Sequence, residues 1–204
     1  GDIEENGETG PVISNHSESN PQKHKLIVVA YPLGRIGSSA AMGLLKLAGV
    51  YVGAEDRLSG AGKINPKGFF ELNSQQAFLE KAFKGFYPDV VDPPSLDQFD
   101  AIGDQHYREY DALLENELGA ASEQNMPAAI KSQRFLTLAF LTRLRDKYDV
   151  HVILMNRNEK DQVESTIRVW KRAGGFHAEH AEYTFLKQWL DKWKAFAEQV
   201  MTRY

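Results

Sequence analysis

The chain has 204 residues, no cysteine and a formal net charge of -4 at pH 7. This length predicts one domain with a sizeable core, and the lack of cysteine excludes disulfides, thiolate metal sites and a cysteine nucleophile. The acidic balance argues against a nucleic-acid partner, whose phosphates would require a basic surface. No run approaches the roughly 18 apolar residues that cross a bilayer, and no apolar signal segment is visible. We therefore expect a cytoplasmic protein, unless a targeting segment preceded Gly1.

The beginning of the chain divides into a polar segment and an apolar one. Residues 1–24 are rich in Glu, Asn, Ser, Gly and Pro and show no periodicity, which predicts a flexible tail before a domain at 25–204. Leu26 to Tyr31 form a continuous apolar run, which is typical of a strand buried on both faces. A turn follows, and from Ser38 a helix ending near Gly49 is expected to bury Ala41, Leu44, Leu45 and Ala48.

The rest of the chain alternates between helical and strand patterns. We expect a loop at 54–70, a helix at 73–85, an irregular segment at 87–103, a helix at 104–124, a strand at 128–131, a helix at 135–147, a buried strand at 151–155, a helix from 158 and a final helix at 180–203. This order predicts an α/β fold with a parallel sheet flanked by helices. The helix from 158 would face the sheet with Val163, Ile167 and Trp170. The aromatic final helix should pack in the core, with a homodimer interface or an acceptor pocket as the alternative.

The turn after the first strand has the residues of a phosphate-binding loop. Gly34 and Gly37 allow the backbone to turn sharply and to bring its N–H groups close to an anion. Arg35 supplies a planar, permanently charged fork, and Ser38 and Ser39 add hydroxyls at a helix N-terminus. A plain strand-to-helix turn, with glycine for geometry and serine as a cap, is the alternative.

A second pair of residues favours an anion site without the magnesium machinery of an NTPase. A Walker A loop has Lys after its last glycine, where this chain has Ser38. The strand at 151–155 leads into Arg157 rather than a Mg²⁺-binding carboxylate, which disfavours a kinase or ATPase. Ser165 lies eight residues after Arg157, so a guanidinium and a helix hydroxyl can converge on one anion.

These motifs resemble those of the sulfotransferases that use 3′-phosphoadenosine 5′-phosphosulfate (PAPS). The turn is similar to their 5′-phosphosulfate loop, with Arg35 at the basic position and Ile36 in the place of a small polar residue. A strand-ending Arg and a Ser eight residues later, like Arg157 and Ser165, grip the cofactor's 3′-phosphate in that family. The resemblance spans about Lys25 to Lys171 and includes two segments similar to the bacterial branch, Asn65–Glu71 and Lys131–Arg134.

The resemblance implies a three-layer P-loop fold and a metal-free sulfuryl transfer from PAPS to a hydroxyl or amine of a small-molecule or carbohydrate acceptor. Adenosine 3′,5′-bisphosphate would be the product. The implied cofactor-binding residues are Gly34, Arg35, Gly37, Ser38, Ser39, Arg157 and Ser165. Arg35 would also lie against the sulfuryl group, and Glu71 is the candidate base, with a surface or helix-capping carboxylate as the alternative. Lys67 and Lys131 could assist the anion but are expected on the surface.

Two other functions remain open at this point. One is an atypical P-loop nucleotide kinase. The other is a non-catalytic relative that keeps the fold as a nucleotide-binding module, because fold alone does not determine function.

Overall fold

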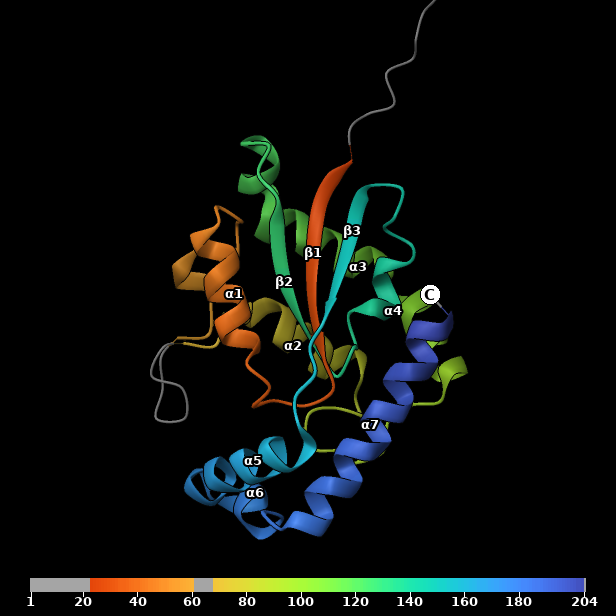
Figure 1. The fold of residues 1–204 in the computed structure, drawn as a ribbon. Coiled ribbons are helices and arrows are strands. Elements are labelled where there is room, and N and C mark those ends of the chain that lie inside the picture. Colours follow the sequence, from red (N-terminus) through yellow and green to blue (C-terminus); the bar gives the residue numbers. More distant parts are fainter. Residues whose placement is uncertain (1–22, 61–67, 204) are drawn as a thin grey trace, which may run out of the picture.

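A computed structural model describes residues 23–60 and 68–203. Three parallel strands form its sheet in the order β2-β1-β3, with β1 at His24–Tyr31, β2 at Ala128–Gln133 and β3 at Tyr148–Leu154 (Figure 1). Val28 of β1 pairs with Ile130 on one side and with Val152 on the other. All three strands therefore end at the same edge of the sheet. The predicted α/β class with a parallel sheet is confirmed.

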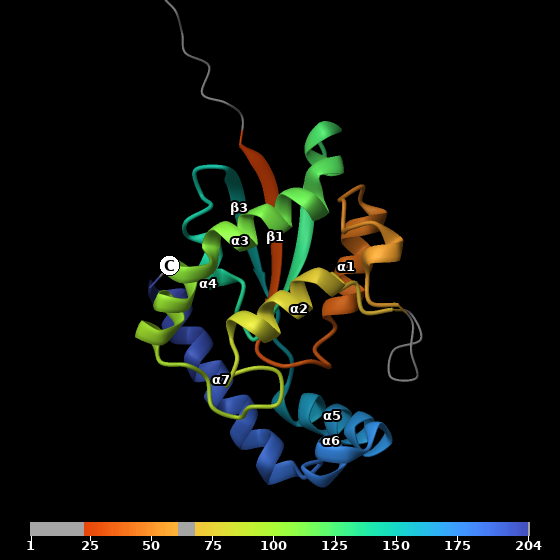
Figure 2. The same cartoon turned by 180° about the vertical axis from the view of Figure 1, so that it is seen from behind.

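Helices surround this sheet. They are α1 (Ser38–Leu47), the 3-10 turn η1 (Glu55–Arg57), α2 (Asn73–Ala82), α3 (Leu96–Glu123), α4 (Leu138–Leu141), α5 (Glu159–Ala173), α6 (Gly175–Glu179) and α7 (Tyr183–Arg203). The larger apolar cluster joins one face of the sheet to α2, α3, α4 and α7, and a smaller cluster joins the other face to α1 (Figures 1 and 2). Helices α5 and α6 lie beyond the carboxyl ends of the strands. This arrangement leaves the carboxyl edge of the sheet facing α5.

Strand β1 is buried as its apolar run predicts. Leu26, Val28 and Ala30 contribute to the larger cluster, and Val29 to the smaller one. The predicted burial of β3 is wrong. Ile153 and Leu154 are 39% and 54% exposed, because β3 is an edge strand and α1 packs over β1 and β2 instead.

The predicted apolar face of α1 is also wrong in part. Met42 is fully buried against Val29 and Val50, and Leu45 packs beside it. Leu44, by contrast, is 68% exposed. The helix is thus rotated so that its single long methionine, rather than the predicted leucine, fills the space above the sheet.

Helix α3 begins inside the segment predicted to be irregular. Ser95 accepts a hydrogen bond from the Gln98 N–H, and the Gln98 side chain accepts one from the Ser95 N–H. This capping box starts the helix directly after the prolines, at Leu96. The predicted helix at 135–147 is reduced to the single turn of α4, with hydrogen-bonded turns on either side.

Helix α5 packs on its neighbouring helices rather than on the sheet, contrary to prediction. The ring of Trp170 lies 5.1 Å from that of Trp189 in α7, at 62°, and also meets His177 of α6 edge-on. In α7, Trp189 and Trp193 are fully buried, which confirms core packing for this helix. The homodimer alternative stays a prediction.

Candidate functional site

The loop between β1 and α1 holds two residues in left-handed backbone conformations. Arg35 has φ 64° and Gly37 has φ 96°. The φ of Gly37 is one that residues with a side chain rarely adopt, which accounts for a glycine at the residue that precedes α1. The N-cap of α1 is Gly37, which has no side chain to accept a hydrogen bond from the first turn and is itself exposed. The helix therefore begins with backbone donors that its N-cap residue leaves without a side-chain acceptor, where an anion is favoured.

Three predicted site residues that are far apart in the sequence come together at this loop. Arg157 follows β3 and donates a hydrogen bond from Nη1 to the Arg35 carbonyl oxygen at 2.7 Å. Arg35 in turn directs Nε toward the Ser165 hydroxyl of α5, at 3.5 Å. Arg157 thus bonds to the backbone of Arg35 and Ser165 meets its side chain, and we call these three residues the anion cluster (Arg35, Arg157 and Ser165). Its donors match the oxygens of a phosphate or sulfate group.

Gln162 fastens α5 to the loop, and sequence reasoning missed it. Its side-chain amide donates to the carbonyl oxygens of Leu33 and Gly34, both at 3.1 Å, and the residue is almost completely buried. Gln162 lies three residues before Ser165, so the two side chains are neighbours on the surface of α5. This i, i+3 spacing from a predicted site residue could have identified Gln162 from the sequence.

The loop serines are less available than predicted. Ser38 is buried, with 7% of its surface exposed. The Ser39 hydroxyl donates to the Phe69 carbonyl oxygen at 3.3 Å and accepts a hydrogen bond from Lys131 Nζ at 3.0 Å. Ile36, at the position of a small polar residue in the resembling family, is 5% exposed and packs inward. Within this loop, the groups best placed to bind an anion are therefore the Arg35 side chain and the backbone N–H groups.

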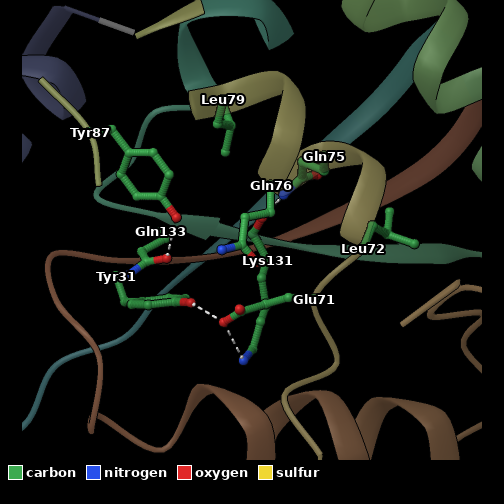
Figure 3. Close-up of a pocket in the computed structure, with 9 residues that line it drawn as sticks. All are labelled: Tyr31, Glu71, Leu72, Gln75, Gln76, Leu79, Tyr87, Lys131 and Gln133. Carbon is green, nitrogen blue, oxygen red and sulfur yellow. Dashed lines mark hydrogen bonds and ion pairs between the residues drawn. The ribbon is translucent and has the colours of Figure 1, made fainter. Parts of the chain in front are cut away.

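Glu71 lies in a polar cluster with Tyr31 and Lys131 (Figure 3). Its Oε1 accepts a hydrogen bond from the Tyr31 hydroxyl at 3.0 Å and forms an ion pair with Lys131 Nζ at 3.2 Å. Because Lys131 Nζ also reaches Ser39, one ammonium group connects the candidate base to the loop between β1 and α1. Glu71 keeps 23% of its side chain exposed, so a solvent-borne group can approach it.

The prediction of a surface position for Lys131 is wrong. Only 2% of its side chain is exposed, and its ammonium group also bonds to the Phe69 carbonyl oxygen. Burial lowers the pKa of Lys131, and the negative charge of Glu71 opposes that shift. Burial raises the pKa of Tyr31 well above its ordinary value, and Glu71 adds to the shift. Tyr31 therefore stays protonated at neutral pH and donates to Glu71, whose negative charge favours the ammonium form of Lys131.

A small pocket lies beside Glu71, lined by Tyr87, Gln133, Gln76 and Leu79 among others (Figure 3). The Tyr87 hydroxyl donates to the Gln133 side-chain oxygen at 2.9 Å and closes one wall. The free space is about 10 Å³, room for about one water molecule. The pocket as it stands has room for one hydroxyl or amine group of an acceptor. A larger group can enter only if the lining side chains move.

Some predicted features lie elsewhere. Asn65, Pro66 and Lys67 lie outside the described residues, as do residues 1–22. Among residues 23–60 and 68–203, no three His, Asp or Glu side chains are grouped so that they could hold a metal ion. In the same part of the chain, no helix is long and apolar enough to cross a membrane.

The chain was compared with protein-family models, with curated proteins and with solved structures, and none of the three comparisons gave a match.

Proposed function

We propose that this protein is a PAPS-dependent sulfotransferase with a three-layer P-loop fold. The observation that carries the proposal is the convergence of Arg35, Arg157 and Ser165 from three distant parts of the chain. When bound, the cofactor supplies a sulfuryl group, whose bond to the 5′-phosphate oxygen breaks as a bond to the acceptor oxygen or nitrogen forms. Adenosine 3′,5′-bisphosphate leaves as the product.

The donors of the site fit such a cofactor. A bisphosphorylated nucleoside needs two groups of donors, one for each phosphate. The backbone of the Gly34–Ser39 loop and the Arg35 guanidinium would hold the 5′ side, and Arg157 with Ser165 would hold the 3′-phosphate. Bidentate contacts from arginine to phosphate are stronger and more directional than neutral hydrogen bonds.

Glu71 would accept the proton of the acceptor hydroxyl or amine as the new bond forms. Lys131 lies between Glu71 and Ser39, so its ammonium group can offset negative charge that develops near the loop. Tyr31 and Lys131 both engage Glu71 Oε1, so neither of them donates a hydrogen bond to Oε2, which would be the basic atom.

Release of adenosine 3′,5′-bisphosphate from PAPS tests this function, with a panel of sugars, phenols and amines as acceptors. We expect transfer to at least one class, and a loss of about 100-fold or more in kcat for Glu71→Gln. Glu80→Gln, a change at an exposed carboxylate of α2, is the matched control and should keep full activity.

A non-catalytic nucleotide-binding module is the second candidate, favoured by the water-sized pocket and by the ion pair that already engages Glu71. Tight binding of adenosine 3′,5′-bisphosphate without transfer to any acceptor would support it over the enzyme.

A further inference from the structure

Helix α5 carries a further cationic side chain, Arg168, near the anion cluster. Arg168 lies three residues after Ser165, so the two side chains are neighbours on the helix surface, about 60° apart around its axis. Ser165 is 8% exposed where it meets Arg35, and Arg168 is exposed one turn farther along. A guanidinium can therefore reach back from Arg168 toward a ligand held at Ser165.

Arg168 makes no ion pair or hydrogen bond with any other described residue. Glu164, four residues before it, would be a suitable partner on the helix surface. That carboxylate instead faces Lys160, at 4.0 Å. Glu159, in the first turn of α5, is engaged by Lys187 at 3.2 Å. Both glutamates of α5 thus face lysines, and Arg168 is available for an external anion.

The charges of the anion cluster alone do not balance the proposed ligand. Each phosphomonoester carries about 1.5 to 2 negative charges near pH 7, so adenosine 3′,5′-bisphosphate carries about three to four. Arg35 and Arg157 contribute two positive charges, and Lys131 is already paired with Glu71. A third guanidinium on the Ser165 side of the site would reduce the imbalance where the 3′-phosphate is expected.

We propose that Arg168 is a further binding residue for the 3′-phosphate of the nucleotide, in addition to Arg157 and Ser165. The inference rests on the proposed function, because it assumes a 3′-phosphorylated nucleotide at the anion cluster. It assigns to α5 a part in selecting 3′-phosphorylated over ordinary 5′-nucleotides.

Affinities for adenosine 3′,5′-bisphosphate and for 5′-AMP, measured by calorimetry at one fixed salt concentration, test this role. We expect Arg168→Gln to weaken bisphosphate binding about tenfold, since a charge-assisted hydrogen bond is lost, and to change 5′-AMP binding less than about twofold. Arg168→Lys should retain part of the bisphosphate affinity because it keeps the charge.

Lys171→Gln is the matched control. It removes the same charge from the same helix, but Lys171 lies about 120° from Ser165 around the axis and should leave both affinities unchanged. If Arg168→Gln leaves the bisphosphate affinity intact, or weakens binding of both nucleotides equally, the role of Arg168 is overturned. The proposed function is not affected by that result. Wild-type protein that binds neither nucleotide, or does not prefer the bisphosphate, would overturn the proposed function as well. The unfolding midpoint of each variant verifies that it folds.

Discussion

The ion pair between Lys131 and Glu71 allows a quantitative prediction about the site. Lys131→Met keeps most of the buried volume but leaves the Glu71 carboxylate with only the Tyr31 hydroxyl as a described partner. Breaking a fully buried pair costs about 3 to 5 kcal/mol. Because 23% of the Glu71 side chain reaches water, we expect a smaller loss, about 2 kcal/mol in the free energy of unfolding. Glu71→Leu leaves the more deeply buried Lys131 ammonium without its counter-ion and should cost about 3 kcal/mol.

Urea unfolding of the wild type, both single variants and the double variant measures the coupling between the two residues. The double variant carries no unpaired charge, so we expect it to lose about 2 kcal/mol less than the sum of the single losses. Such coupling would show that the pair holds Glu71 beside the loop. Losses that add to within about 0.5 kcal/mol would mean that the two charges do not depend on each other and that the pair does not hold Glu71 in place.

Three further predictions concern the fold around the site. Gly103→Ala should lower the free energy of unfolding by about 1 to 3 kcal/mol in urea, because the added Cβ would overlap the Ala139 carbonyl oxygen. Arg134→Met should lower the thermal midpoint, since the buried guanidinium bonds to three carbonyl oxygens of residues 86–90 and lies 4.8 Å from the Trp189 ring. Burial raises the pKa of Tyr110 above its ordinary 10.0, so the unfolded chain releases this proton at a lower pH than the folded chain does. The free energy of unfolding should therefore fall above about pH 10, which circular dichroism can follow.

The sequence predicts the anion cluster better than it predicts the surroundings of the cluster. The glycine and arginine pattern of the first loop and the spacing of Arg157 and Ser165 are local features, and parallel strands bring their carboxyl ends together. Burial of Lys131 depends on Glu71, which lies 60 residues away along the chain. No local pattern reveals such a partner, so the general preference of lysine for the surface gave the wrong answer.

The errors in the fold also have physical reasons. An apolar strand at the edge of a sheet has the same sequence pattern as a central strand, so the exposure of Ile153 could not be distinguished from burial. Ser95 and Gln98 form a capping-box pattern that predicts the start of α3, whereas the prolines just before it predict an irregular segment. The apolar face of α5 does not indicate whether a sheet or another helix covers it, so its packing against α6 and α7 could not be predicted.

If the anion cluster binds a 3′-phosphorylated nucleotide, a titration with two nucleotides will show it. Adenosine 3′,5′-bisphosphate with EDTA and ATP with Mg²⁺ are each titrated into the wild-type protein and into Arg157→Gln. We expect saturable binding of the bisphosphate that does not require a metal, is at least about tenfold tighter than that of ATP and is weakened about tenfold or more in the variant. Tighter binding of ATP that depends on Mg²⁺ would contradict the account and favour the nucleotide kinase.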